Sequence, residues 1–462
     1  MKKALLFSPA LQKDAQAHSK DNSYGLGLAY LHAVIEKAGY EIITKSFNNC
    51  DLAASEAEMA EDLRSFRPDF LLVQIFTMNR VASYRLIKLA RRILPGVKII
   101  IGGVHASIYY EQLLKNFEVD CAVIGEGEET VVELLGALSS GLSAAGIRGV
   151  AYKEHGGAVV KNPDRPLIED LDSLPFPRHD LFIQPDREMA CILTTRGCPF
   201  RCSFCCLHTI SRRKFRKRSV KNVADEVEYI LKTFRNINTI QLADDTFTLD
   251  QPRAIEFCKE IIRRNIKVKF LCSARIKPAS VELFKLMEQA GFTGIGFGLE
   301  TGSAKLLRSI HKNITREDVL ETFRMLKDVN IKIVTYLMVG FPGENRDTLA
   351  ETIDLIKKLR KIKYFEFAGV ARLWVYPNTE VYDIMKAAGR IDDGFWLTDQ
   401  DVPFFTLEHS AEELDKMVTE ITLGCTSLRQ GIKRAATELL HPRATAKKII
   451  PRLRRLKKYF YR

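Results

Sequence analysis

The sequence lacks any run of about 18 or more apolar residues, which excludes a transmembrane helix. Its first residues, MKKALLFSPALQKD, have too short an apolar stretch for a secretory signal peptide and no small-residue cleavage site. We interpret residues 3–8 as a β-strand instead. We therefore expect a cytoplasmic location, where cysteines rarely form structural disulfides.

Cysteine is scarce before residue 190, where only Cys50 and Cys121 occur, and then gathers in the stretch TTRGCPFRCSFCCLH. Cys198, Cys202 and Cys205 form the pattern C-x3-C-x2-C, with no fourth cysteine at matching spacing. Iron–sulfur clusters are held by cysteine thiolates, and a fully ligated cubane takes four of them. Three thiolates leave one iron open, as a catalytic metal requires. We expect a cluster whose open iron could chelate a small molecule through an amine and a carboxylate.

Two other uses of these thiols remain open. Structural zinc needs a fourth Cys or His, and Cys206 and His208 lie nearby, although adjacent cysteines cannot easily share one ion. A redox pair at Cys202 and Cys205 would leave Cys198 without a role. The scattered cysteines are expected to be small buried hydrophobic residues.

Acidic residues are fewer than basic ones: the chain has 57 Asp and Glu and 70 Lys and Arg, which gives a net charge of +13. Two basic runs stand out, RRKFRKR at 212–218 and the tail at 447–462, which has no acidic residue. Each is either a solvated face or an anion site, and the tail could be a membrane-surface helix that reaches a lipid substrate. The charge would permit nucleic-acid binding, but no aromatic–basic recognition motif supports it, so no nucleic-acid partner is expected.

The first third of the chain alternates apolar runs with amphipathic segments such as 26–39 and 81–94. The predicted strands are 3–8, 40–46, 69–76, 97–103 and 121–125. This βαβ repetition predicts an α/β fold with a doubly wound parallel sheet, which binds ligands at the carboxyl ends of its strands. Glycines cluster at those ends, either for close approach to a ligand or for simple turns.

The remainder divides into three parts. Residues 141–185 are interpreted as a linker with a hairpin at 149–160, between a first domain at 1–140 and a second at 186–400. The second domain repeats six βα units, which predict a full or partial barrel with its site at the strand ends. Its predicted strands are 190–196, 239–245, 268–275, 294–300, 333–340 and 364–371. Residues 401–462 are expected to be helical.

The stretch RGCPFRCSFC resembles the CxxxCxΦC signature of radical S-adenosylmethionine (SAM) enzymes, with Phe204 as the aromatic residue. The motifs ADDTF, SAR, GFGLETGS and MVGFPGE stand where that family places its strand-end motifs. The first domain resembles a Rossmann-like cobalamin-binding domain through YGLGLAYLHAVIEKAGYE, GGVHAS and GEGEET. Residues 1–400 thus resemble the B12-binding radical SAM proteins, which include class B methyltransferases and the anaerobic protoporphyrin-ester cyclase type.

The resemblance implies a partial (β/α)6 barrel with a [4Fe–4S] cluster on Cys198, Cys202 and Cys205, and SAM on the fourth iron. The SAM contacts that it implies are Phe204 near the adenine, Asp244 at the amino group, Arg275 and Glu300 at the ribose or methionyl portion, and Gly340 and Gly343 by backbone approach. The cobalamin contacts that it implies are Gly25, Thr77, Gly102, Gly103, Gly125, Glu126 and Gly127.

The segment expected to supply the lower axial ligand of cobalt differs from the D-x-H-x-x-G motif of methionine-synthase-like domains. Here Asp14 and His18 are spaced D-x3-H, with no glycine three residues after the histidine, so ligation by histidine is not expected. His105, near the expected nucleotide tail, is a poor candidate.

The resemblance implies reductive cleavage of SAM to a 5′-deoxyadenosyl radical, with methylation of an unactivated carbon as the leading interpretation. A radical cyclase or rearrangement enzyme for a tetrapyrrole-like or lipid substrate is the alternative. Methylthiolation of tRNA would need a second cysteine triad near the N-terminus, and a metal-stabilised nucleic-acid-binding module is disfavoured. The expected partners are a small-molecule or lipid substrate and a flavodoxin- or ferredoxin-type electron donor, with peripheral membrane contact through the tail as an option.

Overall fold

The computed structural model describes residues 1–9, 25–47, 52–154 and 156–425. Asp14, His18, Cys50 and the basic tail at 447–462 lie outside the described residues. Within the described ranges, no helix is both long and apolar enough to cross a membrane.

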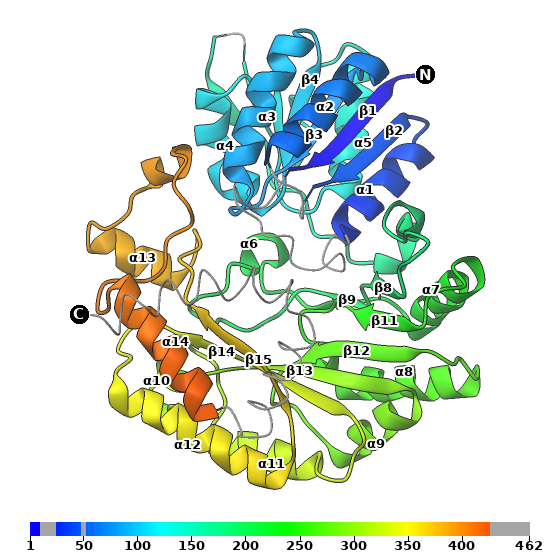
Figure 1. Cartoon of the computed structure of the whole chain (residues 1–462). Helices are drawn as coiled ribbons and strands as arrows, with labels where there is room; N and C mark the ends of the chain where they lie inside the picture. Colours follow the sequence, from blue (N-terminus) through cyan, green and yellow to red (C-terminus); the bar gives the residue numbers. More distant parts are fainter. Residues whose placement is uncertain (10–24, 48–51, 155, 426–462) are drawn as a thin grey trace.

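Among the described residues, the first sheet has seven strands in the order β2-β1-β3-β4-β5-β6-β7 (Figure 1). Its parallel strands are β1 (Lys3–Ser8), β2 (Glu41–Ser46), β3 (Phe70–Gln74), β4 (Lys98–Gly102) and β5 (Cys121–Val123). The helices of the described chain that connect and cover them are α1 (Leu26–Lys37), α2 (Leu52–Phe66), α3 (Arg80–Ile93), α4 (Val104–Asn116) and α5 (Glu128–Ser139). The strand order reverses between β1 and β3, the switch point at which such sheets bind ligands.

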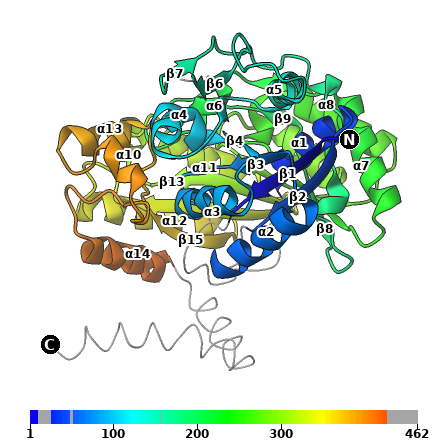
Figure 2. The same ribbon diagram turned by 90° about the horizontal axis from the view of Figure 1, so that it is seen from above.

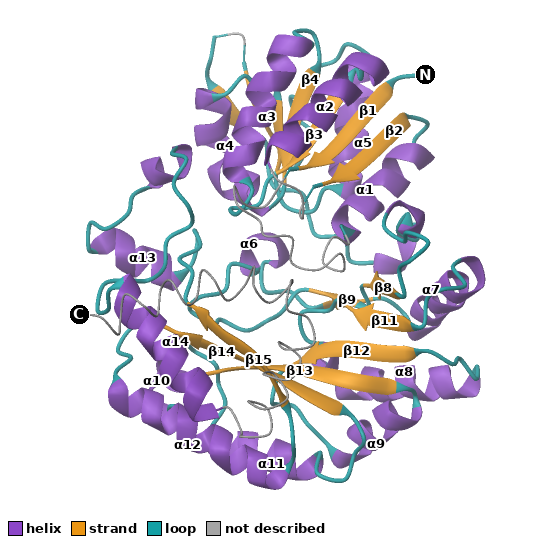
Figure 3. Cartoon of the chain, in the orientation of Figure 1, coloured by secondary structure: helices purple, strands orange, loops and turns teal. Residues whose placement is uncertain are grey.

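Helices cover both faces of this sheet (Figure 3). Leu6, Leu72 and Ile100 pack in one core with α1 and α5. Leu71 and Ile99 pack on the opposite face in a core that includes α2, α3 and α4. Because both faces are buried, the central strands β3 and β4 are apolar along most of their length, whereas the edge strand β2 carries Glu41, Thr44 and Lys45.

The expected hairpin forms, but it belongs to the first sheet. β6 (Val150–Lys153) pairs antiparallel with β5, and β7 (Val159–Lys161) pairs with β6. Asn162 then fixes the end of the hairpin by donating to the carbonyls of Ala144 and Ile147 at 2.8 and 2.9 Å. The first sheet therefore extends to Lys161, and the irregular connection to the second sheet follows it.

The second sheet has six parallel strands that follow one another in sequence order, with β8 and β15 at its two ends. The strands are β8 (Met189–Ile192), β11 (Thr239–Leu242), β12 (Lys269–Ala274), β13 (Phe292–Glu300), β14 (Lys332–Val339) and β15 (Glu366–Arg372). The helices along its outer side are α7 (Val220–Thr233), α8 (Gln251–Arg263), α9 (Val281–Gln289), α11 (Arg316–Met325) and α12 (Arg346–Ile362) (Figure 1). The expected partial (β/α)6 barrel is confirmed.

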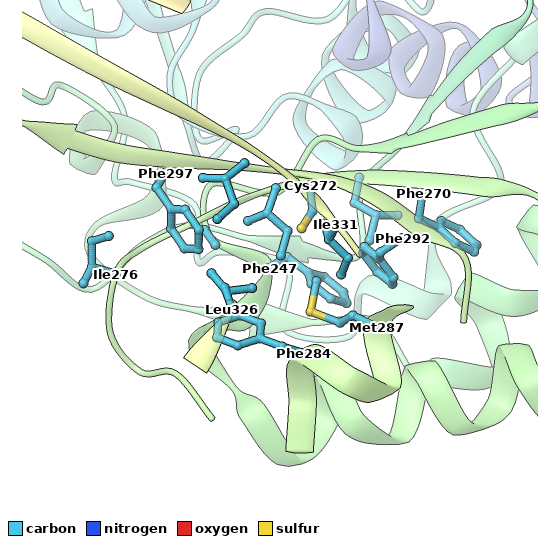
Figure 4. Close-up of a cluster of buried hydrophobic side chains, with 14 of the residues drawn as sticks. Phe247, Phe270, Cys272, Ile276, Phe284, Met287, Phe292, Phe297, Leu326 and Ile331 are labelled. Carbon is cyan, nitrogen blue, oxygen red and sulfur yellow. The ribbon is translucent and has the colours of Figure 1, made fainter. Parts of the chain in front are cut away.

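Apolar side chains from this sheet and its helices interdigitate in a single core. Figure 4 shows Phe270, Phe292 and Phe297 of the strands against Phe284 and Met287 of α9. Burial of a side chain of this size stabilises the fold by about 1.5–3 kcal/mol. Since successive residues of a strand point to opposite faces, the alternate positions of β13 face the inside of the barrel.

The two parts share a core. Figures 1 and 2 show the first sheet lying over the barrel, with α6 (His208–Ser211) between them. Trp396 and Phe405, which follow α13 (Glu380–Ala387), belong to the same buried cluster as the α3 and α4 side of the first sheet. α14 (Ala411–Cys425) packs against α12 and β15. The barrel therefore cannot move as a unit away from the first sheet without exposing this core.

Candidate functional site

The three expected cluster cysteines lie on one loop that follows β8. β9 (Thr195–Arg196) and β10 (Arg216–Lys217) pair antiparallel and close this loop, called here the cysteine loop (197–215). Gly197 starts it with φ of +87°, and a Cβ there would collide with the carbonyl of Lys214, so only glycine allows the two ends to approach. Phe204 contacts Phe341, with ring centroids 5.7 Å apart. The loop therefore meets the GFPGE segment that follows β14.

Cys198, Cys202 and Cys205 are partly buried free thiols. Across the described part of the chain, no three His, Cys, Asp or Glu side chains converge on a point that could hold a single metal ion. Cysteine thiolates are the ligands that hold iron–sulfur clusters, and the three thiols lie on one loop. Burial raises the pKa of Cys205 to about 11 and also raises that of Cys198, so bound metal would favour the thiolate form of these residues.

A charged group lies beside the cysteine loop. Arg275 places a guanidinium nitrogen 3.7 Å from the Cys202 sulfur, stacks on Phe200 and donates to the carbonyl of Lys312. Lys312 in turn pairs with Glu300 at 2.6 Å, with both side chains nearly buried. Glu300 has φ of +65°, an unfavourable conformation for a non-glycine residue of the kind that clusters at functional sites. Arg275 and Glu300 were expected here from sequence, whereas nothing in the sequence pointed to Lys312.

Gly340 and Gly343 shape the turn after β14, with φ of +95° and +80°. Their amides are already engaged, since Gly340 donates to Glu344 at 2.5 Å and Gly343 donates to Glu408 at 2.7 Å. Burial raises the pKa of Glu344 to about 7. A ligand could approach these glycines at Cα or carbonyl oxygen, but their N–H groups are occupied.

Asp244 and Asp245 follow β11 and point in different directions. Asp244 is buried, and its carboxylate accepts from the amides of Thr194 and Thr195 at 2.6 and 3.0 Å and from the Thr194 hydroxyl at 2.5 Å. Asp245 accepts from the amide of Gly197 at 3.2 Å and lines a cavity. Burial raises its pKa to about 6. Asp244 thus anchors Thr194 and Thr195, which lie between β8 and the cysteine loop. Asp245, which the sequence analysis did not select as a SAM contact, is the aspartate that faces open space.

The cavity has a volume of about 330 Å³ and lies between the first sheet and the cysteine loop. Five of the expected cobalamin contacts line it: Gly102, Gly103, Gly125, Glu126 and Gly127. Leu207, Ile210 and Asp245 line it from the barrel side. It extends as an apolar slot between the sheet and α1 and α5, where Leu31, Leu72 and Val131 form its walls. The glycine-rich strand ends therefore face the cysteine loop.

Gly25 and Thr77 are not among the residues that line this cavity. A Cβ on Gly25 would lie 3.0 Å from the ring of Phe182, so this glycine gives room to a neighbouring side chain. The Thr77 hydroxyl lies 3.3 Å from Nδ1 of His105. His105 is fully buried, its Nε2 lies 3.0 Å from the hydroxyl of Tyr84, and burial lowers its pKa to about 3. It is a neutral core residue on the α3 and α4 side of the sheet.

Four charged side chains form the wall of the cavity between the two parts, and we call them the Glu–Arg cluster. Glu126 pairs with Arg216 at 2.7 Å and with Arg196 at 3.1 Å, and Glu128 pairs with Arg196 at 2.7 Å. Burial opposes ionisation of Glu126, but the two guanidinium groups bring the pKa of its carboxyl below the ordinary value. Glu126, expected to contact cobalamin, is therefore bound to the strands that close the cysteine loop.

The basic run 212–218 is not a bare positive patch. Most of its cations pair with carboxylates from other segments: Arg212 with Asp164, Lys214 with Glu169, Arg216 with Glu126, Lys217 with Asp250 and Arg218 with Glu226. The run therefore ties the cysteine loop to its surroundings, and it leaves little free positive charge for an anionic polymer.

Two family matches cover most of the described chain. Residues 192–356 match the Radical SAM superfamily, and residues 13–135 match the B12 binding domain. A curated relative, the uncharacterized methyltransferase PH0819 of Pyrococcus horikoshii, is 30% identical over 85% of this chain and 85% of its own length. The anaerobic magnesium-protoporphyrin IX monomethyl ester cyclase of Rubrivivax gelatinosus is 30% identical over 71% of this chain and 61% of its own length.

Solved structures share the fold. The methyltransferase TsrM from Kitasatospora setae superposes with a TM-score of 0.68 and 21% identity, over 84% of this chain and 77% of that one. The cobalamin-dependent enzyme OxsB superposes with a TM-score of 0.69 and 20% identity, over 84% of this chain and 61% of that one. Both resemblances extend across the first sheet and the barrel.

Proposed function

The chain belongs to the B12-binding radical SAM proteins, and on that premise we propose that it is a cobalamin-dependent radical SAM enzyme that methylates an unactivated carbon. One observation carries the proposal: the glycine-rich strand ends of the first sheet and the cysteine loop of the barrel line the same cavity. When bound, a reduced [4Fe–4S] cluster supplies the electron that cleaves SAM, and cobalamin carries the methyl group.

Cys198, Cys202 and Cys205 would hold three irons of the cluster, and the fourth iron would remain for the amino and carboxylate groups of SAM. The donor set fits this group, because all three residues are free, partly buried thiols on one loop, and iron–sulfur clusters are held by cysteine thiolates. Arg275, beside the Cys202 sulfur, would balance part of the negative charge that the thiolates bring.

Asp245 is the carboxylate that we assign to the amino group of SAM, because the oxygens of Asp244 are already engaged. Phe204, half-buried and packed on the fully buried Phe341, offers an apolar wall for the adenine. The buried pair of Glu300 and Lys312 offers one acceptor and one cation for the ribose and methionyl portions.

Cobalamin would occupy the cavity under the first sheet. Gly102, Gly103, Gly125 and Gly127 leave its mouth without side chains, and the apolar slot beyond suits a flat aromatic group such as the base of the nucleotide tail. Among the described residues, no histidine lines this cavity, and His105 lies in the core. Cobalt would therefore be held without a histidine ligand from the described residues.

A radical cyclase is the second candidate, and the 30% identity to the anaerobic magnesium-protoporphyrin IX monomethyl ester cyclase favours it. The substrate would be a small molecule or a lipid in either case.

An external one-electron donor of the flavodoxin or ferredoxin type would reduce the cluster. Peripheral membrane contact through the basic tail stays a prediction, as does a cytoplasmic location.

The fate of SAM separates these functions. Protein reconstituted anaerobically with iron and sulfide is incubated with SAM and dithionite, with and without hydroxocobalamin. A methyltransferase should form 5′-deoxyadenosine, and it should also form S-adenosylhomocysteine that depends on hydroxocobalamin. A cyclase should form 5′-deoxyadenosine alone.

Matched cysteine variants control this assay. Cys202→Ala should abolish 5′-deoxyadenosine, whereas Cys258→Ala, in the outer core of the barrel, should retain it. Failure of the wild-type protein to form either product would refute the proposed function.

A further inference from the structure

Glu126 holds both strands at the base of the cysteine loop. Its Oε1 accepts from Arg216 at 2.8 Å and from Arg196 at 3.1 Å, and its Oε2 accepts from Arg216 at 2.7 Å and from the amide of Ile168 at 3.0 Å. Arg196 and Arg216 are directly paired residues of β9 and β10. One carboxylate therefore fixes both ends of the segment that carries the three cysteines.

The same residue belongs to the cavity wall. Gly125 and Gly127, its neighbours in the chain, line the cavity together with Glu126 itself. Gly125 has φ of +83°, and a Cβ on Gly127 would lie 3.2 Å from Leu31 across the slot, so the backbone here is tightly placed. A ligand that fills the cavity must rest against this turn, and movement of the turn must shift the carboxylate of Glu126.

The contact is strongly directional. The side chains of Glu126 and Arg216 are 8% and 5% exposed, so solvent barely screens the pair. A guanidinium that donates two parallel hydrogen bonds to one carboxylate fixes orientation as well as distance. Burying ion pairs adds little stability compared with apolar packing, whereas it specifies one arrangement in several proteins. The Glu–Arg cluster is thus suited to transmit position between the cavity and the loop.

We propose that Glu126 is a positioning residue that couples the two cofactor sites, so that cobalamin in the cavity and a cluster on the cysteine loop each strengthen binding of the other. This inference rests on the proposed function. Coupling of this kind is reciprocal, because the factor by which one ligand changes the affinity for the other is the same in both directions.

Titration with hydroxocobalamin tests the coupling. Its dissociation constant is measured by absorbance for wild-type protein with a reconstituted cluster and for protein stripped of iron by a chelator. We expect binding about tenfold tighter when the cluster is present. In Glu126→Gln the ratio should fall close to one. With excess dithionite keeping both groups reduced, the EPR line shape of the cluster should differ with and without bound cobalamin in the wild type and not in Glu126→Gln.

Glu129→Gln is the matched control, because Glu129 lies one turn away on α5 and its side chain is 53% exposed. It should keep the wild-type ratio. If Glu126→Gln does not fold, Arg216→Lys decides, since it retains the charge but loses the paired hydrogen bonds. A wild-type ratio near one, or an unchanged ratio in the folded Glu126 or Arg216 variant, would overturn the coupling alone. A wild-type protein that binds neither group would overturn the proposed function as well.

Discussion

Asp244 and Asp245 are adjacent in the chain, yet their carboxylates have different surroundings. Asp244 accepts three hydrogen bonds from Thr194 and Thr195 and is buried. Asp245 accepts one from Gly197 and faces the cavity. The first holds the end of β8 in place, and the second remains available to a cationic ligand.

Substitution by asparagine should separate these roles. Asp244→Asn places an amide group against donors, so it should lower stability by about 1–3 kcal/mol. Asp245→Asn should leave the melting temperature close to that of the wild type, but it should weaken SAM binding to the cluster-loaded protein. Thermal melts and equilibrium dialysis with SAM measure the two effects. Equal loss of SAM affinity in both variants, without a stability difference, would contradict the assignment.

The spacing of Cys198, Cys202 and Cys205 was enough to propose them as a donor set, and the structure places all three on one loop. The sequence also pointed to Arg275 as part of the site. It did not predict Lys312, because the residues around Lys312 match no recognised motif. Lys312 comes close to Glu300 only in the folded chain. The choice between two adjacent aspartates also needed the structure, since both follow the same strand.

β13 carries glycine at three alternate positions that face the inside of the barrel: Gly294, Gly296 and Gly298. A Cβ at Gly296 would lie 2.9 Å from the ring of Tyr336 on β14, and one at Gly294 would lie 2.8 Å from Leu271 on β12. Neighbouring side chains can therefore lie flat across β13. Tyr336 is still 47% exposed among the described residues, so this inner face leaves room for a substrate.

Gly296→Ala should force the Tyr336 ring to move and cost about 1 kcal/mol of stability, the low end for overpacking, because this ring is partly exposed. The same change in a Tyr336→Ala background should cost much less, because the ring that it meets is absent. Gly136→Ala on α5, where nothing lies within 4 Å of an added Cβ, is the control and should be neutral or stabilising. Thermal melts of the four variants measure this, and an equal cost of Gly296→Ala in both backgrounds would refute the contact.

Strands could be predicted from the sequence where helices bury both faces of the sheet. Runs such as residues 69–76 are apolar because helices cover both faces, so the period of the pattern and the fold agree. The hairpin of β6 and β7 was found in sequence, but its attachment to β5 was not, since short strands carry little information about their partners. The basic run 212–218 was ambiguous for a similar reason, because its carboxylate partners are spread along the chain.

The site is formed by the two parts of the molecule together. A shared core joins them, and Tyr84 of α3 donates to the carbonyl of Trp396 at 3.1 Å across more than 300 positions of sequence. The Glu–Arg cluster makes a second junction at the cavity. Sequence patterns predicted the fold of each part separately. Only the folded chain shows that the glycine-rich strand ends face the cysteine loop.

Metal and sulfide analysis of anaerobically reconstituted protein, combined with EPR before and after addition of SAM, tests most directly whether the cysteine loop holds an open cluster. We predict about four iron and four sulfide per chain, and a reduced-cluster signal that SAM alters and that Cys202→Ala removes. Stoichiometric zinc in place of iron, or protein without acid-labile sulfide, would contradict this account.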